Sequence, residues 1–289
     1  MEHQLPNDYT NRPIHIHVVG CGGTGSQLMP RLVQLHNTLL ALGHQYGLAV
    51  TLWDADAVSA SNIVRQNFVS ADIGRNKAEV TINRLNVIYG LNWEARPVYF
   101  TGDSYHHGDF FIGCVDTKKS RAEIAKAATK AHHCYWIDIG NRKADGQMIV
   151  GEAGSVFRNK RRADAQPRLP LVTELLPEIV EGPEDDNTPS CSAAQSILRQ
   201  GVATNLMGAT WAFAWLAEAL RYGKIGWHGV FFNLESGRAN PIPVDPERWI
   251  AFRSHYGFEA WYCQPGHDGS HEKTVPVEIK GGTRTMLTW

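Results

Sequence analysis

The fold of this chain is decided by Val18-Val19-Gly20-Cys21-Gly22-Gly23-Thr24-Gly25-Ser26, in which glycines follow an apolar segment. Gly20 suits a tight turn after a buried strand, and Gly22 and Gly23 leave backbone N–H groups open to a polyphosphate. Gly25 lets the following helix pack closely on the strand. The stretch therefore predicts a nucleotide site near the amino end. Taken alone, Gly-x-Gly-x-x-Gly is shared by binders of NAD, FAD and ATP.

Apolar segments and helical segments alternate on both sides of this turn. The apolar runs predict strands over Ile14–Val19, Val50–Trp53, Ala95–Tyr99, Phe110–Val115 and Tyr135–Ile139. Helical spacing predicts helices over Thr24–Leu42, Lys77–Tyr89, Ser120–Lys130 and Ala193–Tyr222. Two strands joined by a turn at residues 235–238 are expected within 229–244. The pattern predicts an α/β fold, a Rossmann-like and largely parallel sheet flanked by helices, with an additional C-terminal β-hairpin or antiparallel portion.

Composition excludes several classes of partner. The chain has 289 residues, 43% of them hydrophobic, and its 28 Lys and Arg nearly balance 29 Asp and Glu. A formal charge of -1 gives no basic field for nucleic acid. No apolar run approaches the roughly 20 residues that span a bilayer, and residues 1–4 have no secretory character, so we expect no membrane partner and a cytoplasmic protein.

The cysteines indicate neither a disulfide framework nor a four-cysteine zinc site. Their number is odd and no C-x-x-C pair occurs among Cys21, Cys114, Cys134, Cys191 and Cys263. Two histidine pairs, at 106–107 and 132–133, are poor substitutes because neighbouring side chains on most backbones point in different directions. We expect no zinc.

Polar residues downstream of the glycine turn sharpen the prediction. Their pattern is D-x-D-x-V-x-x-S-N-x-x-R-Q followed by G-x-x-K, and it contains Asp54, Asp56, Asn62, Arg65, Gln66 and Lys77. Together with G-x-G-G-x-G, this resembles the ThiF, MoeB and HesA family, the bacterial relatives of ubiquitin-activating enzymes. The likeness covers roughly residues 14–244, and it is closest to the ThiF-type proteins of the plasmid-associated PRTRC system.

The resemblance implies an enzyme that uses ATP to adenylate the C-terminal glycine of a ubiquitin-like or sulfur-carrier protein. It places Asp54 on the ribose, Asn62, Arg65 and Lys77 at the polyphosphate, and Asp116 as a magnesium ligand. The nucleotide-binding set also includes Asp56 and the glycines Gly20, Gly22, Gly23 and Gly25, with Gln66 and Arg121 in supporting roles. ATP and Mg²⁺ are the implied cofactors.

The chemistry explains these residue types. A carboxylate that attacks the α-phosphorus of ATP is an anion that meets an anion, so cations must neutralise the phosphates and hold the attack in line. Arg65, Lys77 and a magnesium ion on Asp116 would supply that charge. No general base is needed, because the carboxylate is already ionised. Alone, Asp116 could instead be a helix cap, since it follows a strand and precedes a helix.

Cys191 is a second candidate catalytic residue. It follows an irregular, charged segment, residues 158–189, and precedes the long predicted helix, the place where family members carry a cysteine for a covalent sulfur step. A thiolate is favoured near a helix N-terminus. The alternative is a small buried residue, which is the common fate of a free cysteine.

The family resemblance also sets expectations for organisation and partners. It implies a homodimer and a conjugating-enzyme-like partner. It also implies an adenylation domain over residues 1–245, with halves 1–150 and 151–245, and an extension over 246–289. Arg12 is the only nearby candidate for an arginine that reaches across a dimer. Two alternatives stay open: an NAD-dependent oxidoreductase, which would use the glycine turn and Asp54 alone, and a non-catalytic partner subunit of an activating enzyme.

Overall fold

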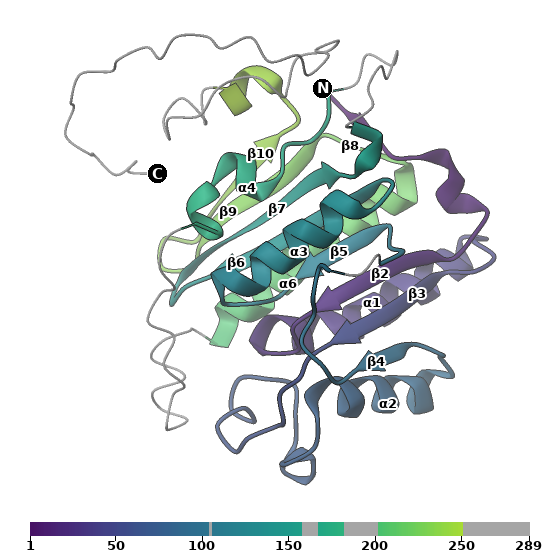
Figure 1. Ribbon diagram of the computed structural model, residues 1–289, viewed down its shortest axis with the longest axis vertical. Coiled ribbons are helices and arrows are strands. Elements are labelled where there is room, and N and C mark those ends of the chain that lie inside the picture. The colour runs from purple at the N-terminus through teal and green to yellow at the C-terminus, as the bar shows by residue number, and fades with distance from the viewer. Residues whose placement is uncertain (104–105, 158–166, 182–201, 251–289) are drawn as a thin grey trace.

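A central sheet of eight strands forms the middle layer of the protein (Figure 1). The computed structural model describes residues 1–103, 106–157, 167–181 and 202–250. In spatial order the strands are β10 (Arg238–Pro243), β9 (Trp227–Asn233), β7 (Asp145–Ala153), β6 (Cys134–Asn141), β5 (Phe110–Gly113), β2 (Ile14–Val19), β3 (Leu48–Trp53) and β4 (Glu94–Arg96). The five strands from β6 to β4 are parallel, and β7, β9 and β10 are joined to them by antiparallel pairs. A small second sheet pairs β1 (His3–Gln4) with β8 (Lys224–Ile225).

Helices cover both faces of the sheet. Figure 1 shows α3 (Lys118–Lys130) and α4 (Val172–Leu175) in front of it, and α1 (Gly23–Ala41) and α6 (Val202–Tyr222) behind. The helix α2 (Lys77–Tyr89) lies beside β4 at the far end, and single 3-10 turns form η1 (Asn7–Thr10), η2 (Ser70–Asp72), η3 (Ser155–Phe157) and η4 (Pro177–Ile179). This arrangement is the doubly covered parallel sheet that the alternating pattern predicts.

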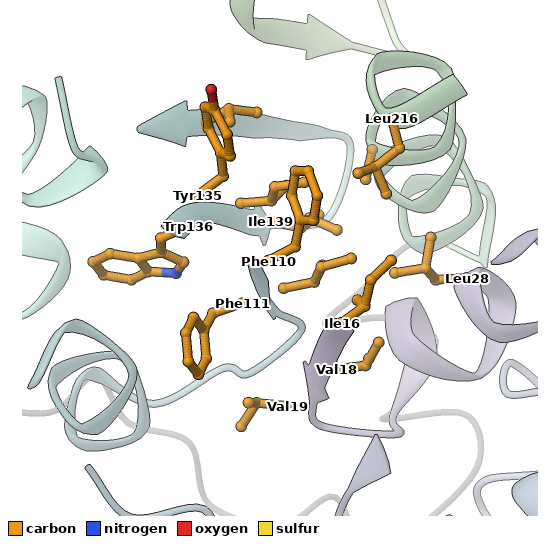
Figure 2. Close-up of a cluster of buried hydrophobic side chains, with 14 of the residues drawn as sticks. Ile16, Val18, Val19, Leu28, Phe110, Phe111, Tyr135, Trp136, Ile139 and Leu216 are labelled. Atoms are coloured by element: carbon orange, nitrogen blue, oxygen red, sulfur yellow. The ribbon is translucent and has the colours of Figure 1, made fainter. Parts of the chain in front are cut away.

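The core lies on both sides of β2, β5 and β6 because successive residues of a strand face opposite sides. Figure 2 shows Ile16 and Phe110 directed toward Leu28 of α1 and Leu216 of α6, whereas Phe111 and Trp136 lie on the other side. All six side chains are almost completely buried. The long apolar face of α6 therefore belongs to the core, as the sequence predicts.

The predicted elements agree with the structure in kind and order, and the bounds of several strands differ by one to three residues. The first part of the predicted helix Ala193–Tyr222 lies outside the described residues, and the rest of it is α6. The α2 bounds match, since Asn76 caps the helix start by accepting from Glu79 N and Gly90 ends it in the left-handed region. The predicted C-terminal hairpin is confirmed as β9 and β10. The strand β7 was not predicted, so the antiparallel portion begins earlier than expected, and β4 ends at Arg96 because Pro97 cannot donate to a ladder. In the described ranges, no helix is long and apolar enough to cross a membrane.

Candidate functional site

Three parallel strands end side by side at one edge of the sheet, which we call the carboxyl edge. Val19 of β2 lies opposite Trp53 of β3 and Gly113 of β5. The segments that follow are the glycine turn, Asp54 and the loop that contains Asp116. The sequence therefore places the predicted site residues where open α/β sheets bind ligands.

The glycine turn is packed so tightly that Gly20, Gly23 and Gly25 cannot be replaced without a shift. Gly20 has a φ of +95°, and a Cβ there would lie 2.6 Å from the carbonyl oxygen of Cys114. A Cβ on Gly25 would lie 2.0 Å from the carbonyl oxygen of Gly20. Gly22, the N-cap of α1, has nothing within 4 Å of its Cβ position. The turn thus presses the start of α1 against the sheet and leaves its outer side open.

Asp54 is fixed against this turn. Its Oδ2 accepts a hydrogen bond from the backbone N–H of Cys21 at 2.6 Å, and its Oδ1 accepts from that of Asp56 at 2.8 Å. Burial raises the pKa of Asp54, and the positive charge of Lys77 acts in the opposite direction. A carboxylate oxygen has more than one lone pair, so both oxygens can accept from a further hydroxyl.

Lys77 brings a buried ammonium group to the same place. It is the first residue of α2, and its Nζ donates to Asp56 Oδ2 at 2.9 Å. The Lys77 side chain is 8% exposed, whereas that of Asp56 is 55% exposed. Asn76 ties the start of α2 to the end of β3 by donating to the carbonyl oxygen of Asp54 at 2.9 Å. The charge of Lys77 is therefore held at the edge, paired with the exposed carboxylate of Asp56.

The segment around Asn62 forms the next wall of the site. Asn62 Oδ1 accepts from Ser59 N at 2.9 Å, and the backbone N–H of Gln66 donates to the carbonyl oxygen of Asn62 at 2.9 Å. Asn67 N donates to Ser26 Oγ at 3.1 Å, which joins this segment to the first turn of α1. Gln66 is buried, and its Oε1 has no hydrogen-bond partner in the part of the chain described.

Arg65 and Asp116 bring opposite charges to the edge from different loops. Burial lowers the pKa of the half-buried Arg65, and the negative charge of Asp116 acts in the opposite direction. Asp116 is exposed. The alternative that Asp116 caps α3 is wrong, because the N-cap is Thr117, whose side chain accepts from Ser120 N at 3.2 Å. Asp116 is therefore not the N-cap of α3.

Asp138 is a buried charged residue near the carboxyl edge that the sequence analysis missed. Arg121 Nε donates to Asp138 Oδ1 at 3.1 Å, and both side chains are buried between α3 and the sheet. Burial raises the pKa of Asp138, and the charge and hydrogen bond of Arg121 oppose this. The pair anchors the first turns of α3 directly after Asp116. A charged residue inside the apolar run of β6 was the signal in the sequence.

A magnesium ion would fit this edge only together with other ligands. In the described part of the chain, no group of three or more His, Cys, Asp or Glu could hold a metal. Magnesium often takes one or two carboxylates and receives its remaining oxygens from phosphates and water. The exposed carboxylate of Asp116 suits that mode of binding.

One predicted residue lies outside the described part of the chain, and another lies away from the site. Cys191 lies outside the described residues. Arg12 lies at the opposite edge of the sheet, where its NH1 and NH2 donate to the carboxylate of Asp109 at 2.7 and 2.6 Å. Within its own chain Arg12 is therefore committed to a structural ion pair.

Comparisons with known proteins bear on the family and the fold. The sequence matches the ThiF family over residues 10–239. No curated protein matches it. The solved structure of PaaA is similar, with a TM-score of 0.54 and 16% identity over 80% of this chain and 64% of that one. Two structures of E. coli MccB are also similar: the one with ATP has a TM-score of 0.51, the one with AMPCPP and MccA has 0.52, and each is 14% identical over 82% of this chain. The chain spans only 65% of the length of MccB.

Proposed function

The chain belongs to the ThiF family, and from this premise we propose that it is an ATP-dependent adenylyltransferase. Its substrate would be the C-terminal glycine of a ubiquitin-like or sulfur-carrier protein. The observation that carries the proposal is the convergence of Arg65, Lys77 and Asp116 on the edge that holds the glycine turn and Asp54. An NAD-dependent oxidoreductase would leave those three charges without a role.

Each part of the edge suits one part of ATP. The open outer side of Gly22 and the positive end of α1 favour phosphate oxygens. Asp54, already fixed by two backbone N–H groups, can accept from a ribose hydroxyl. Asn62 and the guanidinium of Arg65 line the polyphosphate side. Gln66 Oε1 and Asp56 complete the polar wall.

In the proposed reaction, a carboxylate oxygen of the carrier forms a bond to the α-phosphorus. The bond from that phosphorus to the bridging oxygen breaks, and pyrophosphate leaves with the electron pair. Arg65 and Lys77 stabilise the negative charge that gathers on the phosphates in the transition state. A magnesium ion on Asp116, when bound, would add charge neutralisation. The attacking carboxylate is ionised at neutral pH, so none of these residues needs to remove a proton.

We propose a second, covalent step on Cys191. Its thiolate would attack the acyl carbon of the adenylate, form a thioester and release AMP. The carrier would then pass to a conjugating-enzyme-like partner or a sulfur acceptor. This step rests on the position of Cys191 in the sequence, directly before the region of α6.

MccB supports the proposal at the level of the fold. It has been solved with ATP and with AMPCPP together with MccA. A protein of this fold thus holds a nucleotide and a second molecule. From the family resemblance we also propose a homodimer in the cytoplasm and a particular closeness to PRTRC-system proteins. The proposed adenylation domain covers residues 1–245, with halves 1–150 and 151–245, and an extension follows over 246–289.

ATP–pyrophosphate exchange with candidate carrier proteins tests this function. The expected result is exchange that requires a carrier with an intact C-terminal glycine, and a thiol-sensitive adduct on a non-reducing gel that Cys191→Ala removes. Exchange without the adduct would retain adenylation and reject the role of Cys191. Binding of NAD with no exchange would overturn the proposal in favour of an oxidoreductase, and no exchange with any carrier would favour a non-catalytic partner subunit.

A further inference from the structure

A buried asparagine on α6 occupies the inner side of the glycine turn. Asn205 is 1% exposed and lies in the first turn of the described part of α6. Its Oδ1 accepts from Thr24 Oγ1 at 3.2 Å and also from Asn141 Nδ2. One side chain therefore joins the first turn of α1, the end of β6 and the start of α6.

The side chain of Asn205 fills the space that a Cβ on Gly23 would occupy. A Cβ on Gly23 would lie 2.3 Å from Asn205 Nδ2 and 2.5 Å from its Cγ. Gly22, its neighbour in the turn, has nothing within 4 Å of the same position. The two adjacent glycines therefore serve different purposes. Gly22 opens the turn toward solvent, and Gly23 admits the amide of Asn205 against the backbone.

The amide nitrogen of Asn205 is left over in this arrangement. Both printed hydrogen bonds use Oδ1, and Nδ2 has no acceptor among the described residues although it is buried. Buried polar groups are almost always paired, so a donor without an acceptor needs an explanation. Nδ2 lies against the first turn of α1, whose N-cap Gly22 supplies no side-chain hydrogen bond. The helix end and this amide are therefore two sources of positive potential at the same turn, the amide on its inner side and the helix end toward its open side.

We propose that Asn205 is a positioning residue for the phosphates at the glycine turn. The inference rests on the proposed function and deepens it by one residue. Oδ1 fixes the Thr24 hydroxyl and with it the first turn of α1. The uncommitted N–H of Nδ2 adds positive potential to the same turn, and this potential is used when a phosphate anion binds outside Gly22. The two hydrogen bonds of Oδ1 are enough for a structural role, and they do not explain why Nδ2 is buried without an acceptor among the described residues.

The decisive variant is Asn205→Asp. It keeps an acceptor for Thr24 and Asn141 and keeps the shape, but it replaces the N–H donor with a second oxygen. The account predicts that the Kd for ATP rises roughly tenfold or more, as expected for a change of charge at a helix N-terminus. The melting temperature should fall, because the new carboxylate is buried, and the positive end of α1 offsets only part of that cost. Calorimetric titration with ATP and thermal melting measure the two quantities.

Thr204→Ala is the matched control. Thr204 is the neighbouring buried residue on α6, and its hydroxyl donates to the carbonyl oxygen of Lys143 at 2.9 Å without contact to the glycine turn. It should lower the melting temperature and leave the Kd for ATP unchanged. If Asn205→Asp binds ATP as the wild type does, the positioning role is wrong while the proposed function stands. If the wild type itself binds no ATP, the proposed function fails and this inference fails with it.

Should Asn205→Asp fail to fold, Asn205→Ser provides the test, since serine keeps a hydroxyl at this site in a smaller side chain. Combined with Gly23→Ala, it also tests the packing. Gly23→Ala alone should weaken ATP binding, because the new methyl group displaces the amide. The double variant should then bind ATP no worse than Asn205→Ser alone. Independent, additive losses in the two variants would overturn the claim that Asn205 acts on the turn through Gly23.

Discussion

The two edges of the parallel sheet differ in how completely their buried polar side chains are paired. At the amino edge, where β5 begins and β7 ends, the carboxylates of Asp109 and Glu152 are paired with cations or backbone donors. At the carboxyl edge, Asp54 and Asp138 also accept hydrogen bonds, but burial still raises the pKa of each carboxylate. The comparison separates an edge whose charges stabilise the fold from the edge where we propose that a nucleotide binds.

The amino edge is satisfied by its own residues. Asp109 accepts from both terminal nitrogens of Arg12 and from His15 N at 2.8 Å. Burial alone would raise the pKa of Glu152, but the hydrogen bond from His133 and the charge of His3 lower it below the usual value. Leu169 N donates to its second oxygen at 3.0 Å. In the described residues, the buried polar atoms left over near this edge belong to neutral rings, Tyr9 Oη and His228 Nε2.

The carboxyl edge is not satisfied in this way. Gln66 Oε1, Asp138 Oδ2 and Asn205 Nδ2 are buried without a hydrogen-bond partner among the described residues. Each of these residues lies beside the glycine turn or the loop of Asp116. A protein that pairs its charges at one edge and leaves polar atoms over at the other indicates where a polar ligand belongs.

The largest expected effect comes from removing the cations of the carboxyl edge. Arg65→Ala and Lys77→Ala should each lower ATP–pyrophosphate exchange by about 10² to 10³, the usual loss for one group that stabilises transition-state charge. Thermal melting should show little change, because Asp56, the partner of Lys77, is exposed. Arg221→Ala, an exposed arginine that stacks on Tyr222, is the control and should leave exchange unchanged. Equal exchange in all three variants would show that these cations are not part of the site.

Removing a cation from the amino edge should lower stability and leave exchange unchanged. Arg12→Ala leaves Asp109 buried without its main partner, and breaking a buried pair costs about 3 kcal/mol of unfolding free energy. Exchange per folded molecule should not change. Arg248→Ala is the control, because its partner Asp245 is partly exposed and such pairs contribute about 1 kcal/mol or less. Denaturant unfolding measures both variants, and a loss of exchange with full stability in Arg12→Ala would contradict the comparison.

Acid should destabilise the protein through two buried histidines. Burial lowers the pKa of His17 and of His228 to about 4. Below the ordinary value of about 6.5 the unfolded chain takes up protons that the folded chain does not, so stability falls as the pH falls from about 6.5 toward 4. At pH 5.5 the loss should be about 1.4 kcal/mol for each histidine. His228→Gln should reduce the slope of unfolding free energy against pH, and an unchanged slope would contradict this assignment.

The smallest expected effect is that of Gly22→Ala on stability. The Cβ position of Gly22 is open, so unfolding free energy should change by no more than about 0.5 kcal/mol. The affinity for ATP should still fall, because the methyl group occupies the side from which a phosphate reaches the turn. Gly226→Ala, at another open position, is the control for the mutation itself. Unchanged ATP affinity in Gly22→Ala would show that the phosphates do not bind against this glycine.

The sequence predicted the parts of the site that local chemistry specifies. Asp54 and Asp116 follow apolar strands, and strand ends meet at one edge in any parallel sheet. Asn205 could not be predicted in this way, because it lies in a long apolar helix and meets Gly23 only in the folded chain. The strand β7 was missed since Gly146, Gln147 and Glu152 interrupt its apolar pattern, and pairing with β6 overrides that local signal.

Calorimetric titration with ATP and with NAD tests the central claim most directly. The wild type and the amino-edge variant Arg12→Ala should bind ATP alike, Arg65→Ala should bind it far more weakly, and NAD should not bind. This result would locate the ligand at the carboxyl edge and the structural charges at the amino edge. Binding of NAD in place of ATP, or equal binding of ATP by Arg65→Ala and the wild type, would contradict the account.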